Sequence, residues 1–327
     1  MEKEKAKIGI ALGGGGLRGL AHIGVLEFME EENVPVDAIA GTSMGGIIAG
    51  LYAAGVPITK LKEIGTKTGI LDFATPDPNR HGLIGHSKMQ QFFADLLGSE
   101  TITFADLKTP TAMIAADLET GEMVILNEGP LIPAMMATSA FPIVFSPVYH
   151  KDRWLVDGGV LNNLPIDIVR AMGVDRVIGV NTPPSLHKLL SVPKEHEKRP
   201  RLSPHSILSL IARPGDWKTP MLIAENSVAF TADIVNEQRL KTCPPDLLLH
   251  VSIPNTGTFV ADDSLKIIQS GYQTAKEETQ QFQMLRETPK PTAWRRGWNE
   301  TIQKLKHAWE AYKAPTHTLF PPSEEIH

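Results

Sequence analysis

The feature that most constrains the fold of this chain is a serine between glycines, in the sequence Gly-Thr-Ser-Met-Gly-Gly at residues 41–46. An apolar stretch precedes it, and residues 44–54 have the composition of a helix. A serine on a sharp strand-to-helix turn needs neighbours without a Cβ atom, and Gly41 and Gly45 flank Ser43 at the required spacing. The pattern therefore predicts a nucleophile elbow, with the partial positive charge of the helix N-terminus beside the serine.

A second glycine-rich turn precedes the elbow. Residues 7–12 are an apolar strand that runs into the loop Gly-Gly-Gly-Gly-Leu-Arg-Gly at residues 13–19, which is followed by an expected helix. Such a loop exposes backbone N–H groups that can bind an anion. The glycine spacing also fits a dinucleotide-binding fingerprint. That motif needs an acidic residue at the end of the second strand, but here the second strand ends in the turn that contains the serine. Because adjacent parallel strands bring their loops to one sheet edge, we favour an oxyanion hole for Ser43.

Two further side chains in this region have competing interpretations. Arg18 can hold the glycine loop in shape through hydrogen bonds to carbonyl groups, or it can bind a phosphate or carboxylate of the substrate. We favour loop support. His22 is a candidate base only by its position on the next helix, and we expect it to be a buried histidine with a hydrogen-bond partner instead.

The candidate for the catalytic base lies later in the chain, at another glycine-rich strand end. Residues 153–156 have the pattern of a strand that runs into Asp157, Gly158 and Gly159. Two glycines after a strand allow the backbone to approach another group closely, so the carboxylate can be presented to a site. Because strands, loops and helices alternate here, we expect a three-layer α/β/α sandwich with a mostly parallel central sheet.

Three motifs, in this order, resemble those of the bacterial branch of the patatin-like phospholipase family: GGGLRG at residues 14–19, GTSMG at residues 41–45 and DGG at residues 157–159. Each motif is modest alone, but the ordered set is specific. The resemblance is strongest over residues 7–181 and continues weakly to about residue 275. It implies the patatin-like variant of the α/β fold.

This resemblance implies a catalytic dyad. Ser43 is the implied nucleophile, and Asp157 is the implied base that takes its proton as it attacks an ester carbonyl. A normal aspartate is a poor base at pH 7, so we expect burial to raise the pKa of Asp157. No histidine, metal ion or cofactor is implied. The other candidate site residues are the oxyanion donors Gly14, Gly15, Gly16 and Met44, the supporting Arg18, and the motif glycines Gly41, Gly45, Gly158 and Gly159.

A Ser-His-Asp triad is disfavoured by the residues themselves. The histidines that follow the candidate aspartate include His187, His196, His205 and His250, and none lies in a glycine-shaped turn. An ordinary triad hydrolase also places its elbow after several strands, whereas Ser43 follows the second expected strand.

Composition and charge narrow the class of protein. The 327 residues carry a net charge of −5, so we expect no nucleic-acid partner. Cys243 is the single cysteine, which excludes an intrachain disulfide and favours a reducing, cytoplasmic setting. The first residues mix charges of both signs and are not typical of a signal peptide. No stretch approaches the roughly 18 apolar residues of a spanning helix, so we expect only peripheral contact, at the inner membrane surface.

The sequence of the C-terminal third indicates where the domain ends. We expect a catalytic domain over residues 1–286 and an extension over residues 287–327, which contains a linker, a helix and a tail. Within the domain, residues 182–220 are rich in proline and charge and form either a lid or a surface loop. The expected helix, at residues 293–313, has an aromatic stripe opposite an excess of basic residues. It either binds a lipid surface or docks on its own domain. Its candidate interface residues are Trp294, Trp298, Leu305, Trp309 and Tyr312.

These features together predict a metal-independent serine acyl-hydrolase. It is expected to cleave acyl esters of lipids through an acyl-enzyme, as an esterase or as a phospholipase of the phospholipase A or lysophospholipase type. An alternative is a regulatory or adaptor protein that keeps a patatin-like site but acts by binding partners. A nucleotide-binding protein is a third interpretation, supported only by the glycine spacing of the first loop.

Overall fold

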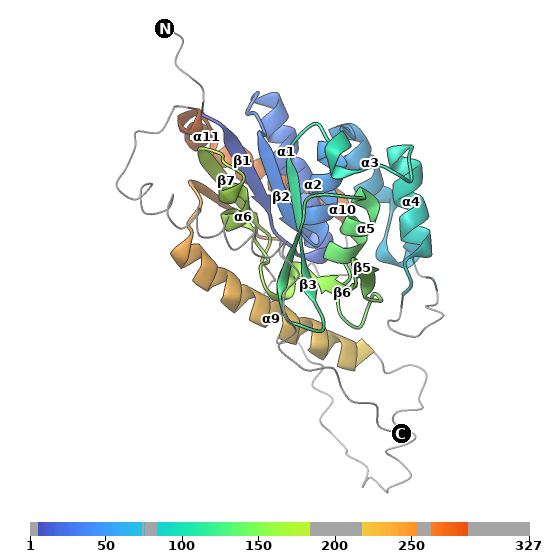
Figure 1. Cartoon of the computed structure of the whole chain (residues 1–327). Coiled ribbons are helices and arrows are strands. Elements are labelled where there is room, and N and C mark those ends of the chain that lie inside the picture. Colours follow the sequence, from blue (N-terminus) through green and yellow to red (C-terminus); the bar gives the residue numbers. More distant parts are fainter. Residues whose placement is uncertain (1–5, 74, 76–83, 184–217, 254–262, 287–327) are drawn as a thin grey trace, which may run out of the picture.

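The computed structural model describes residues 6–73, 75, 84–183, 218–253 and 263–286, which form an α/β fold around one sheet (Figure 1). The strands are β1 (Ile8–Leu12), β2 (Ala38–Thr42), β3 (Thr111–Asp117), β4 (Met123–Leu126), β5 (Val148–His150), β6 (Arg153–Asp157), β7 (Arg176–Asn181) and β8 (Leu247–His250). The α-helices are α1 (Ala21–Glu31), α2 (Met44–Ala53), α3 (Ile58–Lys67), α4 (Ser87–Leu97), α5 (Leu131–Thr138), α6 (Ile166–Ala171), α9 (Lys218–Thr242), α10 (Ser264–Glu277) and α11 (Thr279–Leu285). Short 3-10 helices are η1 (Gly16–Leu20), η2 (Ile70–Phe73), η3 (Phe104–Asp106) and η4 (Gly158–Val160).

The sheet is parallel in its centre and antiparallel at one side. Its order is β5-β6-β3-β2-β1-β7-β8, and β4 also pairs with β3. The strands from β3 through β2, β1 and β7 to β8 run parallel, whereas β4, β6 and β5 pair antiparallel. The predicted α/β fold is therefore confirmed, with a mixed sheet whose parallel part places the ends of β1 and β2 side by side.

Alternate residues of the central strands face two separate cores. Ile8, Ile10 and Leu12 belong to a large core that α1, α2, α3, α4, α5, α10 and α11 cover. Ala11 faces a smaller core beneath α6 and the C-terminal part of α9. A Cβ atom on Gly9 would lie 2.4 Å from Val169 Cγ1, so small residues on this face allow α6 to pack close to the sheet. The arrangement is the predicted sandwich of three layers.

Helix α10, from the C-terminal part of the chain, packs against α1. A Cβ atom on Gly24 would lie 1.9 Å from the carbonyl oxygen of Ile268, and one on Gly271 would lie 1.9 Å from that of Ala21. These two glycines therefore allow α1 and α10 to approach backbone to backbone. Since α1 follows the glycine loop directly, this packing also supports the loop.

Several local predictions differ from the structure in detail. The sequence predicts helices over residues 222–235 and 263–285. The structure has a longer first helix, α9, and divides the second into α10 and α11. Most of the expected lid or loop at residues 182–220 lies outside the described residues. The expected Trp-rich helix at residues 293–313 lies wholly outside them, so both stay predictions. Within the described ranges, no helix combines the length and the apolar character needed to span a membrane.

Candidate active site

Ser43 lies on a strained turn between β2 and α2. Its backbone has φ 57° and ψ −127°, a conformation that residues other than glycine rarely adopt. A residue of α5 stabilises the turn, because the backbone N–H of Ser43 donates to Thr138 Oγ1 at 3.1 Å. The Thr138 hydroxyl in turn donates to the carbonyl oxygen of Ile114 at 2.5 Å. The serine is thus presented at the carboxyl end of the parallel strands, as the sequence predicts.

The glycines around the serine are required by close backbone contacts. A Cβ atom on Gly41 would lie 2.3 Å from the backbone of Gly45. A Cβ atom on Gly45 would lie 2.3 Å from the carbonyl oxygen of Leu12 and 2.6 Å from that of Gly13. The elbow therefore packs directly against the end of β1, where the glycine loop begins.

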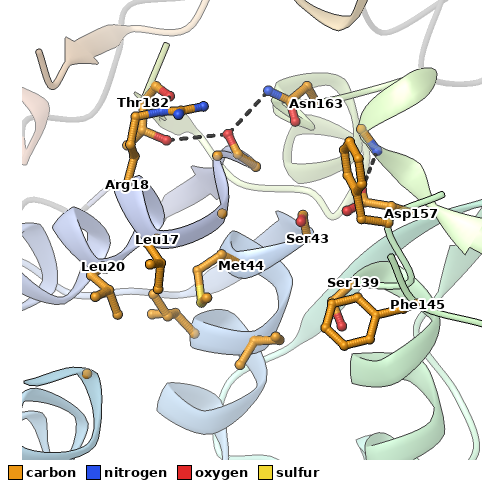
Figure 2. A pocket seen from close by; sticks show the side chains of 18 of the residues that line it. Leu17, Arg18, Leu20, Ser43, Met44, Ser139, Phe145, Asp157, Asn163 and Thr182 are labelled. Carbon is orange, nitrogen blue, oxygen red and sulfur yellow. Dashed lines mark hydrogen bonds between the residues drawn. The ribbon is translucent and has the colours of Figure 1, made fainter. Parts of the chain in front are cut away.

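The glycine loop is fixed through its carbonyl groups. His22 Nε2 donates to the carbonyl oxygen of Gly13 at 2.7 Å. The carbonyl oxygen of Gly14 accepts from Asn163 Nδ2 and from Thr182 Oγ1, each at 3.3 Å (Figure 2). These three hydrogen bonds fix the backbone at the start of the loop.

One expected oxyanion donor is already engaged. The N–H of Gly14 donates to the carbonyl oxygen of Asn163 at 3.0 Å, so Gly14 shapes the loop and does not offer a donor. The N–H groups of Gly15 and Gly16, and that of Met44 in the first turn of α2, have no acceptor among the residues that the structure describes. These three N–H groups are the donors that remain.

Arg18 and His22 support the loop from inside the protein. The buried Arg18 guanidinium donates from Nε to the carbonyl oxygen of Thr182 at 3.4 Å, which favours loop support over substrate binding. His22 is fully buried, and desolvation lowers its pKa to about 4, although the hydrogen bond to Gly13 acts in the opposite direction. The imidazole is therefore neutral, with its proton on Nε2, and stays a loop support at neutral pH.

Asp157 ends β6 and is buried beside Ser43. Its Oδ1 accepts the N–H of Gly159 at 2.8 Å, as Figure 2 shows. Burial raises the pKa of Asp157 to about 6, while hydrogen bonding to the Ser43 side chain and to Gly159 lowers it. A Cβ atom on Gly158 would lie 2.4 Å from the carbonyl oxygen of Ile114, so this motif glycine lets the aspartate turn lie against β3.

Three polar side chains that no sequence motif indicates hold the site together. Thr138 positions the elbow, and Asn163 and Thr182 hold the glycine loop. Each has only a weak signal in the local sequence. Thr138 carries a hydroxyl group in an otherwise apolar helix, and Asn163 and Thr182 follow the end of a turn or strand at the carboxyl edge of the sheet. Their partners lie 95 to 168 residues away, so spacing in the sequence does not reveal them.

An apolar cavity of about 200 Å³ opens beside the two catalytic candidates. Ser43 and Asp157 line it together with the glycine loop (Figure 2). Most of its wall is aliphatic or aromatic, and it comes from η1, α1, α2, α3, η2, α4, α9 and the segment that follows α5. The wall residues include Leu17, Leu20, Ile23, Met44, Ile47, Leu61, Ile64, Phe73, Phe92, Phe141, Phe145 and Ala232. In the described part of the chain, no group of three or more His, Cys, Asp or Glu residues is placed to hold a metal ion.

The chain is similar in sequence to known proteins. Residues 10–170 match the family model described as patatin-like phospholipase. An uncharacterised NTE family protein of Mycobacterium tuberculosis is 33% identical over 181 residues, which are 54% of this chain and 49% of that protein. Lysophospholipase nte1 of Emericella nidulans is 26% identical over 318 residues, which are 91% of this chain and 19% of that protein. The chain thus spans half or less of the length of these relatives.

A solved structure shares the fold. The crystal structure of VipD from Legionella pneumophila superposes with a TM-score of 0.53 and 12% sequence identity, over 86% of this chain and 67% of that one. At this identity, the likeness concerns the arrangement of strands and helices alone.

Proposed function

This chain belongs, through its residues 10–170, to the patatin-like phospholipase family, and on that premise we propose that it is a serine hydrolase of lipid acyl esters. Ser43 is the nucleophile and Asp157 the general base. The observation that carries the proposal is their placement: a strained serine lies beside a buried aspartate of raised pKa, at an apolar cavity. No specific observation favours the adaptor or nucleotide-binding alternatives.

The geometry supports a two-step acyl transfer. Asp157 takes the proton of the Ser43 hydroxyl as the serine oxygen attacks the ester carbonyl, and the protonated aspartate then gives that proton to the departing alcohol. The N–H groups of Gly15, Gly16 and Met44 stabilise the oxyanion that forms in between. Asp157 then takes a proton from water as the water oxygen attacks the acyl-enzyme, and it returns that proton to the Ser43 oxygen as the bond to the acyl group breaks and the acid is released. His22 takes no part, because it does not line the cavity and its Nε2–H donates to the carbonyl oxygen of Gly13.

The cavity favours lipid substrates over small polar esters. Its apolar wall can bury an acyl chain, and each buried methylene contributes about 0.8 kcal/mol. An apolar cavity beside the dyad suits a substrate that inserts an acyl chain, of the phospholipase A or lysophospholipase type. The name of the Emericella nidulans relative, a lysophospholipase, points the same way.

A fluorophosphonate probe tests the nucleophile directly. We expect the wild type to be labelled and Ser43→Ala to be unlabelled, because the probe reacts with an activated serine hydroxyl. Ser139→Ala is a matched control, since Ser139 lines the same cavity but donates its hydroxyl to the carbonyl oxygen of Met135 at 2.8 Å. Mass spectrometry locates the label. Labelling that persists in Ser43→Ala, or absence of turnover on a series of acyl esters and lysophospholipids, would contradict the proposal.

The pH dependence of kcat/KM should report the base. Asp157 must be ionised to accept a proton, and its pKa is raised to about 6. We therefore expect kcat/KM to be constant above about pH 7 and to fall about ten-fold per pH unit below about pH 6. Initial rates on a soluble short-chain ester between pH 4.5 and 8.5 measure this. An inflection near the ordinary aspartate value would show that Asp157 is not the desolvated base.

A further inference from the structure

One residue in the turn after Asp157 connects the two segments that carry the dyad. The backbone N–H of Asn162 donates to the carbonyl oxygen of Gly158 at 2.9 Å, which closes the turn that follows the aspartate. The carbonyl oxygen of Asn162 accepts from Thr42 Oγ1 at 2.8 Å, and Thr42 directly precedes the nucleophile. Asn162 and Thr42 are both fully buried, so water does not compete for these hydrogen bonds. The backbone of Asn162 therefore joins the turn of the base to the turn of the serine.

A largely buried carboxylate holds the side chain of Asn162. Asn162 Nδ2 donates to Asp167 Oδ1 at 2.9 Å, and Arg239 Nη1 donates to Asp167 Oδ2 at 2.9 Å. Arg239 Nε also donates to the carbonyl oxygen of Leu161 at 3.1 Å, so the guanidinium contacts the same turn directly. Each oxygen of Asp167 thus has its own donor. An amide, which has a single oxygen, cannot reproduce this arrangement.

The arginine comes from the helix that also forms part of the cavity wall. Ala232 of α9 lines the cavity, and Arg239 follows it by seven residues, which is about two turns and the same side of the helix. The buried Asn236 lies between them on that side. The inner side of α9 therefore encloses the cavity at one place and is anchored to the turn after the aspartate at another.

We propose that Asp167, held by Arg239, is a positioning residue that fixes the aspartate and the serine of the dyad relative to each other through Asn162. The inference rests on the proposed function, because it assigns a support to that same dyad. Asp167 does not line the cavity, so it acts through the hydrogen bonds of Asn162 and not on the substrate. A small displacement of Ser43 from Asp157 is enough to slow the reaction, because proton transfer requires the two groups to stay within hydrogen-bond distance.

Asp167→Asn tests this role with little change of shape. One of the two donors must lose its acceptor, so we expect kcat on a soluble ester to fall about ten-fold while KM changes less than about two-fold. Asp246→Asn is the matched control. The Asp246 side chain is 17% exposed, against 16% for Asp167, and both of its oxygens pair with arginines. These partners, Arg170 and Arg176, lie outside residues 157–163, so Asp246→Asn should lose stability in urea but keep its kcat.

Titration with the fluorophosphonate probe separates positioning from folding. The fraction of protein that is labelled after long incubation counts the competent sites, and kcat is then expressed per labelled site. We expect the labelled fraction of Asp167→Asn to match that of Asp246→Asn, with kcat per site about ten-fold lower. A role in stability alone would lower the labelled fraction and leave kcat per site unchanged, and that result would overturn the inference.

The other member of the ion pair gives the same test with less disturbance of the core, since the Arg239 side chain is 33% exposed. Arg239→Gln should lower kcat per site about as much as Asp167→Asn does. Arg239→Lys should recover part of the loss, because it keeps a charge beside Asp167 but not the hydrogen bond to Leu161. The double variant Asp167→Asn, Arg239→Gln should lose no more than either single variant, since the two residues act as a unit. Additive losses would show that they do not.

The two proposals fail in different ways. If the wild type is neither labelled nor active on acyl esters, the hydrolase proposal is wrong, and this inference is wrong with it. If the wild type is active and Asp167→Asn equals Asp246→Asn in kcat per labelled site, the positioning role alone is wrong.

Discussion

Replacing Asp157 by asparagine should lower kcat about 10²- to 10⁴-fold, the usual contribution of a general base. The amide has nearly the same shape as the carboxylate, and its oxygen can still accept the N–H of Gly159 that Asp157 accepts at 2.8 Å. It cannot take a proton from Ser43. Rates on a soluble ester, with the labelling rate of the fluorophosphonate probe as a second measurement, give the loss for each step separately.

Stability measurements separate this loss from unfolding. The pKa of Asp157 is about 6 when folded, above the ordinary 3.8, so the folded state binds the proton more tightly than the unfolded chain does. The wild type therefore gains stability as the pH falls from about 6 to 4, and burying the charge costs at most about 3 kcal/mol at pH 8. Asp157→Asn should remove that pH dependence and be at least as stable at pH 8. A variant that is active, or that is unfolded at pH 8, would contradict this account.

The sequence predicts the parts of the site whose signals are local. Glycines at fixed spacing around Ser43 reveal the elbow, because a short stretch of backbone contains the whole constraint. The apolar runs predict β1 and β2, and their neighbouring positions in a parallel sheet predict that the two loops meet. The raised pKa of Asp157 was also expected, since a base must be desolvated to act near neutral pH.

Features that depend on distant partners were not predictable. Thr138, on α5, accepts from the backbone of Ser43, and nothing in the apolar sequence around it indicates which strand end it will face. Likewise, one of three similar glycines, Gly14, has its N–H engaged by Asn163, 149 residues later. Only the fold decides which loop N–H groups remain for an oxyanion.

Replacing Gly45 by alanine should inactivate the protein through the backbone. The new Cβ atom would lie 2.3 Å from the carbonyl oxygen of Leu12 and 2.6 Å from that of Gly13, and neither atom can rotate away as a side-chain tip could. The elbow and the glycine loop must separate, so the serine and the oxyanion donors lose their common geometry. We expect a loss of about 10²- to 10³-fold in kcat, as for a lost oxyanion donor, with about 1–3 kcal/mol of stability.

Gly179, in β7, gives the matched control for this substitution. A Cβ atom on Gly179 would lie 3.2 Å from Ile166 Cδ1 and 3.3 Å from Leu248 Cδ1, both ends of flexible side chains. Gly179→Ala should therefore retain activity and lose less stability than Gly45→Ala in urea unfolding. If Gly45→Ala labelled as fast as the wild type, the contact between β1 and the elbow would not be what aligns Ser43 with its oxyanion donors. The expected contrast follows because one backbone contact joins the nucleophile to the loop that stabilises its transition state.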